Sequence, residues 1–114
     1  AMLENKSGKF VSPGPGPGAA ALSSTEFPSG NLPGSEVRDL RGWNYDPSAP
    51  EAYPIASFTW LMFPTNMGAE RAEVAHKLIE YCLTTGQESA DMMGYVPLPD
   101  NVIEMSREAA RHIR

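Results

Sequence analysis

The chain has one cysteine, two histidines, few basic residues and no long apolar run, and each shortage excludes a class of structure or function. Cys82 cannot form a disulfide within the chain, and its place in an apolar helical pattern predicts a small buried side chain. No stretch reaches the ~18 apolar residues that a transmembrane helix needs. The formal net charge of −5 argues against nucleic acid as a partner, because neutralising its phosphates requires a basic surface.

Groupings of residues that carry out catalysis or hold metals are equally scarce. His76 and His112 lie far apart in the chain, and only Glu73 and Glu80 flank His76 at helical spacing, a pattern typical of a solvated helix face. Cys82, within a helical stripe, would be buried and unreactive. Two further carboxylates follow helical surface spacing and do not converge with the others, Glu70 and Glu88. The sequence therefore predicts no catalytic residue, no metal site and no cofactor.

Residues 1–52 are predicted to form a long Pro/Gly-rich loop region, with a short strand near 9–11 and a short helix near 19–24. The first fifty residues hold seven of the ten glycines and seven of the eleven prolines. The run Pro13–Gly18 alternates residues without a backbone donor with flexible ones, which predicts a loop or linker. It also lacks the Lys-Ser or Lys-Thr pair of a phosphate-cradling loop. Four bulky apolar side chains are expected to dock this region onto the rest of the chain or onto a partner: Val37, Leu40, Trp43 and Tyr45.

Residues 53–114 are predicted to form one α/β domain segment, a strand followed by three helices. The stretch 53–63 is rich in aromatic and branched residues and apolar on both faces, which predicts an interior strand covered by helices. Helices are expected at 69–85, 87–93 and 99–112. The first of these is predicted to carry one apolar stripe, made of Val74, Leu78 and Cys82 with Ala75 and Ile79 beside them.

Three segments, taken together, carry a resemblance to a known family. They are Tyr53-Pro54-Ile55 with Phe58-Thr59-Trp60, then Thr85-Gly86-Gln87, and then Gly94-Tyr95-Val96-Pro97-Leu98-Pro99. In this order they resemble the C-terminal third of the periplasmic phosphate-binding proteins of Pst-type ABC phosphate importers. The segments 4–11 and 40–45 fit as well, so the resemblance covers nearly the whole chain.

The resemblance implies a partial periplasmic-binding-protein lobe. Proteins of this family have two α/β lobes joined by crossing strands, and phosphate binds in the cleft between them; residues 53–63 would be a crossing strand. The family holds the anion with backbone donors at helix N-termini, hydroxyls, an Arg and an Asp. Those ligands lie upstream of the matched region, so no residue here is assigned as a phosphate ligand. One departure is the run Gly14–Gly18, where the family usually has helix-forming residues.

The resemblance also implies the partners and location of the full-length protein. Inorganic phosphate would be its ligand and an ABC permease its partner, and it would work in the periplasm or another extracytoplasmic space. The first residues of this chain, 1–6, contain no apolar h-region, so no signal peptide is expected in it.

The sequence leaves three functions to compare. The first is a C-terminal segment or truncated homologue of a phosphate ABC transporter substrate-binding protein, which takes part in phosphate transport without binding phosphate tightly alone. The second is an interaction module, because residues 53–63 would be uncovered in a monomer and would complete another chain or form a homo-oligomer. The third, an enzyme, would need a convergent polar pocket. Trp43 and Trp60 could stack on a sugar or base, but core or docking roles are favoured.

Overall fold

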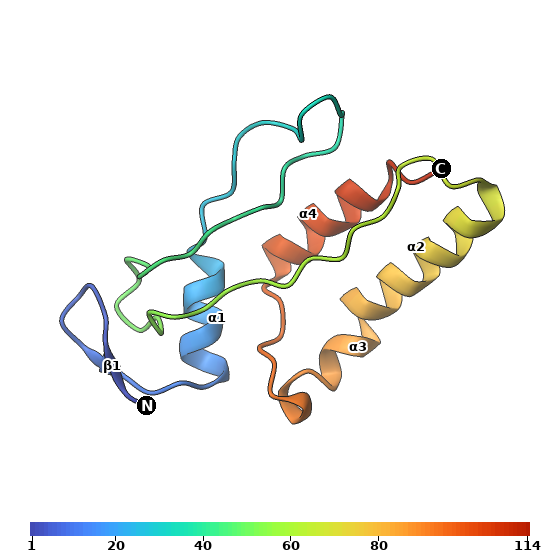
Figure 1. Ribbon diagram of the computed structural model, residues 1–114. Helices are drawn as coiled ribbons and strands as arrows, with labels where there is room; N and C mark the ends of the chain where they lie inside the picture. The colour runs from blue at the N-terminus through green and yellow to red at the C-terminus, as the bar shows by residue number, and fades with distance from the viewer.

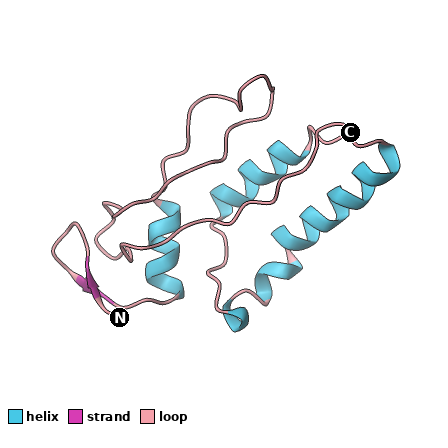
Figure 2. Cartoon of the chain, in the orientation of Figure 1, coloured by secondary structure: helices cyan, strands magenta, loops and turns pink.

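The computed structural model describes all 114 residues and consists of a small hairpin, four α-helices and long irregular connections (Figure 1). Strand β1 (Leu3–Glu4) pairs antiparallel with β2 (Phe10–Val11), with Leu3 opposite Val11 and Glu4 opposite Phe10. Figure 2 shows that the connection between the first and second helices has no helix or strand along its length. The α/β class is confirmed at the level of helices together with a two-stranded antiparallel sheet.

Helix α1 (Pro15–Ser23) begins inside the Pro/Gly run, so the prediction of a loop across residues 13–18 is wrong from Pro15 onward. Pro15 and Pro17 lie in the first turn, where backbone N–H groups have no partner within the helix and the fixed φ of proline already suits helical geometry. Gly18 is the first to close a turn, donating its N–H to the Gly14 carbonyl at 2.9 Å. The alanines that follow are the strongest helix formers and extend the helix.

Residues 53–63 are extended but belong to no sheet, so the predicted interior strand is wrong as a sheet element. An isolated bridge pairs Ile55 with Tyr45, and no backbone–backbone hydrogen bond involves residues 56–63. A strand is stabilised by hydrogen bonds to neighbouring strands, and this chain supplies only the distant hairpin. The pattern therefore forms an extended path without sheet partners.

Three helical segments follow α2 (Ala69–Leu83): α3 (Thr85–Glu88), the short 3-10 helix η1 (Asp91–Met93) and α4 (Asp100–Ala110). Helices α2 and α4 lie within the predicted helices 69–85 and 99–112. The helix predicted at 87–93 is wrong as a continuous helix, because α3 ends at Glu88 and only the 3-10 turn η1 follows at 91–93. Helices α2 and α4 pack side by side (Figure 1). None of the helices is both long and apolar enough to cross a membrane.

The predicted apolar stripe of α2 is only partly buried. The small residues Ala72 and Ala75 are buried with Ile113, whereas Val74 is 66% and Leu78 48% exposed. Side chains that pack around this cluster are Phe63, Met67 and Ile79. The small side chains of Ala72 and Ala75 let the C-terminal segment around Ile113 approach α2 closely. The adjacent face of α2, which carries Val74 and Leu78, is left exposed. Cys82, predicted to be buried, is half-buried.

Backbone hydrogen bonds join the end of the chain to the start of α2. The Arg114 carbonyl accepts from Met67 at 2.8 Å and from Gly68 at 3.2 Å, and the Arg114 N–H donates to Thr65 at 2.8 Å. The ring Nε2 of His76 lies 3.0 Å from the Ile113 carbonyl. Together these contacts hold the C-terminal end of α4 against the first half of α2.

Gln87 connects the end of α2 to the connection that leads into α4. Its side-chain Nε2 donates to the Cys82 carbonyl at 2.6 Å, and its Oε1 accepts from the Leu98 N–H at 2.7 Å. Both partners are backbone groups that would otherwise be unpaired at a part-buried site. A single amide side chain thus ties together two of the segments that carry the family resemblance.

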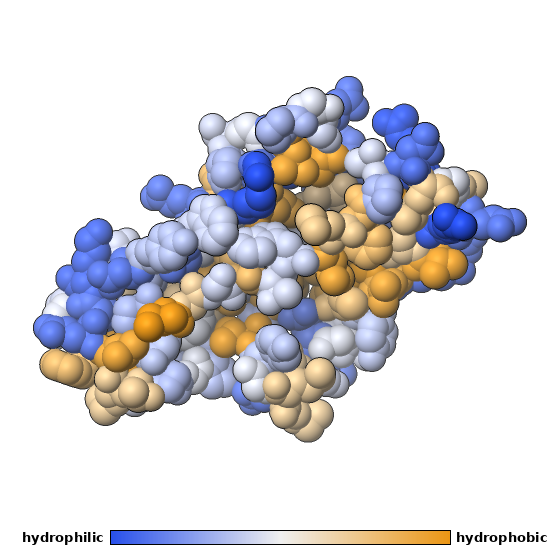
Figure 3. All heavy atoms as spheres, in the orientation of Figure 1, coloured by the Kyte–Doolittle hydropathy of each residue, from blue (hydrophilic) through white to orange (hydrophobic).

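The molecule is flat and has a thin core. Only 15 of 114 residues are buried, and no large side chain is fully enclosed. The radius of gyration is 15.7 Å, against the roughly 13 Å expected for a compact domain of this length. Its extents of 50 × 32 × 18 Å along the principal axes likewise show that the molecule is elongated and thin. Much apolar surface therefore faces outward, and Figure 3 shows apolar residues, in orange, reaching the surface at several places.

Gly18 is the point at which α1 meets the helical half, and we expect Gly18→Ala to destabilise the protein by about 1–3 kcal/mol. An added Cβ would lie 2.6 Å from Cγ2 of Val96, a stiff branched side chain. The matched control is Gly16→Ala in the same helix, where a Cβ meets nothing within 4 Å. Urea denaturation of both variants should show loss of stability for the first alone; equal effects would contradict this packing.

Replacing Gln87 with Met should lower the free energy of unfolding by about 1–3 kcal/mol, because it keeps the volume but leaves the Cys82 carbonyl and the Leu98 N–H unpaired. The control is Glu88→Met, one residue along in α3, where the side chain is exposed. The measurement is the urea midpoint of each variant. Identical midpoints for the two would show that the Gln87 bridge adds nothing.

Candidate functional site

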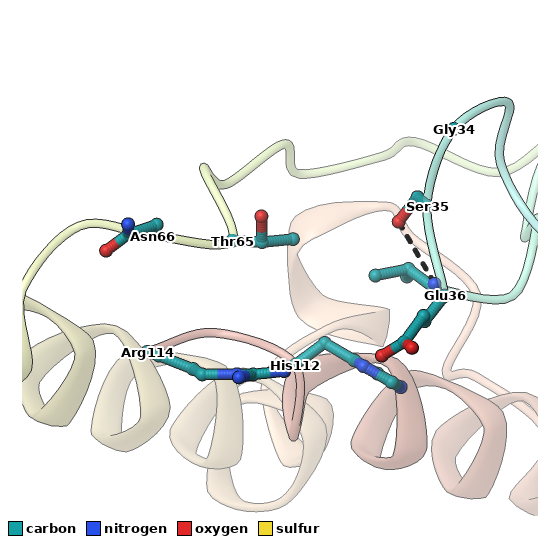
Figure 4. A pocket seen from close by; sticks show the side chains of 8 residues that line it. Gly34, Ser35, Glu36, Thr65, Asn66, His112 and Arg114 are labelled. Atoms are coloured by element: carbon teal, nitrogen blue, oxygen red, sulfur yellow. Dashed lines mark hydrogen bonds between the residues drawn. The ribbon is translucent and has the colours of Figure 1, made fainter.

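A polar cavity of about 350 Å³ lies between the loop that precedes Asp39, the turn before α2 and the end of the chain (Figure 4). Only one of its lining residues is hydrophobic. They are Gly34, Ser35, Glu36, Val37, Thr65, Asn66, His112 and Arg114. Its polar lining makes this cavity a candidate for an anion site.

The side chains of this cavity do not converge on one point. Figure 4 shows Asn66 and Glu36 at opposite ends of the opening, with Arg114 lying along its floor. The Ser35 hydroxyl already accepts a hydrogen bond from the Val37 N–H at 3.0 Å. A tight phosphate site gathers several donors on one anion, and here the Glu36 carboxylate shares the opening with the single cation Arg114. The arrangement does not resemble such a site.

A second hollow, of about 250 Å³, lies over α2 and α4 and is spanned by ion pairs. Arg107 donates from Nε at 3.0 Å and from Nη2 at 2.8 Å to the Glu80 carboxylate, and from Nη1 to Glu104 at 2.6 Å. These hydrogen bonds hold the pKa of Glu80 below its usual value. The ion pair between Arg107 and Glu80 thus holds α4 against α2 at the surface.

The residues weighed as metal ligands have separate partners. Glu73 pairs with Lys77 at 2.6 Å, Glu80 with Arg107, and His76 with the Ile113 carbonyl. No three His, Cys, Asp or Glu side chains come close enough to hold a metal ion. Glu80 and His76 thus link α2 to the C-terminal segment, whereas the Glu73–Lys77 pair lies along α2 itself.

Asp39 forms an interaction that the sequence reasoning missed. Its side chain is buried, and Arg41 donates from Nε at 2.9 Å, from Nη2 at 2.7 Å and from its backbone N–H at 2.9 Å. These bonds lower the pKa of Asp39 to about 2. The Asp39 N–H also donates to the Gly30 carbonyl at 3.1 Å, which closes the 30–39 loop. The Asp-Leu-Arg spacing was the available signal, since side chains two apart in extended chain lie on one side.

Aromatic residues from three parts of the connection meet at the surface. Trp43 stacks on Tyr45 with ring centroids 6.1 Å apart, and lies 5.6 Å from Trp60. Phe58 lies 6.5 Å from Trp60 and 5.6 Å from Phe27. We call these five residues the aromatic strip. Trp43 and Trp60, predicted from sequence as core or docking residues, are both exposed and belong to it.

The side chains at the edge of the aromatic strip are held in place by the backbone. The Trp60 indole N–H donates to the Leu40 carbonyl at 2.8 Å, which fixes the ring against the preceding loop. Asn44 donates from its side chain to the Ala21 carbonyl of α1. The strip is therefore an ordered surface and a candidate for an interface.

Comparison with known proteins finds two curated relatives, both phosphate-binding proteins PstS. The chain is 32% identical over its whole length to the protein from Methanocaldococcus jannaschii and covers 31% of it. It is 27% identical, over 90% of its length, to the protein from Xylella fastidiosa and covers 26% of that one. No family model matches. The chain thus spans less than a third of the length of either relative, and the resemblance stated from its motifs is confirmed.

The Asp39–Arg41 pair predicts a loss of stability in strong acid. The folded pKa of Asp39 is about 2, below its ordinary value of 3.8, so the contribution is complete above 3.8 and is lost as the pH falls through about 2. The free energy of unfolding of the protein should therefore exceed that of Asp39→Asn at neutral pH. The gap should close between about pH 4 and pH 2 in denaturant titrations. A gap independent of pH would contradict the ion pair.

Proposed function

We propose that this chain, which is similar along its whole length to a segment of the PstS phosphate-binding proteins, serves as a structural segment of a phosphate ABC transporter substrate-binding protein. The observation that carries this proposal is the 32% identity across the entire chain to a protein that bears that name. Proteins of this kind are binding proteins rather than enzymes. The segment would form part of one α/β lobe.

The chain contributes to phosphate transport without binding phosphate tightly alone. Helix N-termini are the usual backbone anion sites, and those of this chain suit an anion poorly. Helix α1 begins with Pro15 and Pro17, which have no N–H to donate. Helices α2 and α4 carry Glu70 and Asp100 in their first turns, and these carboxylates repel an anion.

Inorganic phosphate and an ABC permease would be the partners of the longer protein, which would act in the periplasm or another extracytoplasmic space. Within it, residues 1–52 would supply the hairpin, α1 and the loops, and 53–114 the extended segment and the helical pair. Contacts between the two parts support a single unit, since the Tyr53 N–H donates to the Pro17 carbonyl at 3.1 Å and the Trp60 indole N–H to the Leu40 carbonyl at 2.8 Å.

Calorimetry of the chain with inorganic phosphate should detect no binding up to about 1 mM, the concentration that matches a binding free energy of about −4 kcal/mol. The physical reason is the absence of convergent donors in the polar cavity. Micromolar binding would overturn the proposal. In that case Arg114→Gln, which removes the cavity's exposed cation, would show whether the cavity is responsible.

As a positive control, this chain replaces the matching segment of its relative. A chimera of the Methanocaldococcus jannaschii protein, with that segment exchanged for this chain, should bind phosphate within about tenfold of the parent, a change of at most ~1.4 kcal/mol. Circular dichroism and a cooperative unfolding transition would first establish that the chimera folds. A folded chimera without phosphate binding would count against the assigned role.

A further inference from the structure

The turn of the β1–β2 hairpin contains Asn5-Lys6-Ser7, which is the one Asn-x-Ser/Thr sequence of the chain. This sequence is the acceptor for N-glycosylation, in which a transferase attaches an oligosaccharide to the side-chain amide of the asparagine. The other four asparagines of the chain have no Ser or Thr two residues further on. The chain therefore offers a single candidate for this modification.

The folded structure buries the amide that would be modified. Asn5 is only 5% exposed. Its Nδ2 donates to the Pro50 carbonyl at 2.8 Å and to the Ala52 carbonyl at 3.2 Å, so both of its hydrogens are used. Figure 1 shows the hairpin, in dark blue, at one end of the molecule beside the loop that supplies these carbonyls. A transferase cannot reach this nitrogen unless the hairpin leaves the loop.

The remaining atoms of the acceptor sequence are also engaged in the folded hairpin. Asn5 Oδ1 accepts from the Ser7 N–H at 3.1 Å, from the Ser7 hydroxyl at 2.6 Å and from the Lys9 N–H at 3.2 Å. Lys6 donates its N–H to Asp46 Oδ1 at 2.9 Å. All three residues of the sequence thus hold the turn in shape or attach it to the loop, and recognition by a transferase would break these bonds.

The partners of the Asn5 amide come late in the chain. Pro50 and Ala52 lie 45 and 47 residues after Asn5. At the usual rate of synthesis these residues are added roughly 2–9 s after Asn5. During this interval the acceptor sequence already exists, whereas the carbonyls that bury its amide do not. The newly made chain therefore presents an acceptor that the folded protein closes.

We propose that Asn5-Lys6-Ser7 is an N-glycosylation site of the unfolded chain, and that a glycan on Asn5 and the docked hairpin exclude each other. The donor is a lipid-linked oligosaccharide. Asn5 Nδ2 forms a bond to C1 of its first sugar, the bond from C1 to the lipid pyrophosphate breaks, and a base of the transferase takes one amide proton. Nδ2 then keeps one hydrogen, so the carbonyls of Pro50 and Ala52 can no longer both be paired.

The modification in a cell rests on the proposed extracytoplasmic location, because such transferases act outside the cytoplasm. The competition between glycan and hairpin involves no phosphate contact. A negative result in the tests of this site therefore leaves the phosphate-transport proposal unaffected, and the two proposals can fail separately.

A purified oligosaccharyltransferase that accepts Asn-x-Ser/Thr without an acidic residue two positions earlier tests the access to Asn5. With a lipid-linked oligosaccharide as donor, a synthetic peptide of residues 1–12 should be glycosylated at Asn5. The folded chain should react at least about tenfold more slowly, because its amide is released only when the hairpin opens locally. The measurement is the mass of each acceptor over time. Equal rates for the two acceptors would overturn the proposal, and so would a peptide that is not glycosylated.

Cell-free translation tests the competition with folding. The full chain, made behind a cleavable signal sequence in the presence of membrane vesicles that carry the transferase, should be glycosylated at Asn5. The glycosylated chain should then have a lower urea midpoint than the unglycosylated chain. A chain that stays unmodified in the vesicles, or a glycan that leaves the midpoint unchanged, would contradict the proposal.

The matched control carries Ser7→Ala together with Pro33→Ser. These changes remove the acceptor sequence at Asn5 and create one at Asn31, an exposed residue. Its glycosylated form should have the same urea midpoint as its own unglycosylated form, so that only the glycan differs. An equal loss of stability from glycans at Asn31 and at Asn5 would show that the buried amide of Asn5 is not the cause.

Discussion

The close approach of α1 to the connection before α4 joins the two halves of this protein. Gly18 lies against Val96 with no room for a side chain between them. From the same helix, the Pro17 carbonyl accepts the Tyr53 N–H at 3.1 Å, and the Ala21 carbonyl accepts a side-chain hydrogen bond from Asn44. A helix of nine residues thus positions the loop region, the start of the extended segment and the path into the helical pair. The thin core elsewhere gives the arrangement few other links.

The sequence predicted α2 and α4 because their apolar spacing reflects contacts within this chain. It failed at Pro15–Ser23, where proline was interpreted as a helix breaker although its place in the first turn removes no hydrogen bond. It failed again at residues 53–63, because aromatic and branched residues predict a strand without saying whether a partner strand is present. The exposure of Val74 and Leu78 on α2 was missed for a similar reason. The periodicity of apolar residues shows which side of a helix is apolar, but not whether another segment covers that side.

The candidate site was predicted less well than the fold. No ligand residue was assigned from sequence, and the Asp39–Arg41 pair was missed because it depends on a loop closed by backbone hydrogen bonds. Trp43 and Trp60 were predicted to be core or docking residues, but their contact at 5.6 Å depends on the folding back of the connection. The motif containing Gln87 was recognised as family-like. Its physical role, joining the Cys82 and Leu98 backbones, became visible only in three dimensions.

Both tryptophans of the chain lie in the aromatic strip. Intrinsic indole emission of this protein therefore reports on a single surface, and the helical pair of α2 and α4 contributes nothing to it directly. A solvent or a neighbouring molecule that reaches the strip will shift the emission maximum while the helices remain folded. Conversely, unfolding of α2 and α4 can leave the indole fluorescence unchanged while it reduces the helical circular dichroism in the far ultraviolet. The position of two side chains thus separates the indole signal of the aromatic strip from the far-ultraviolet signal of the helices.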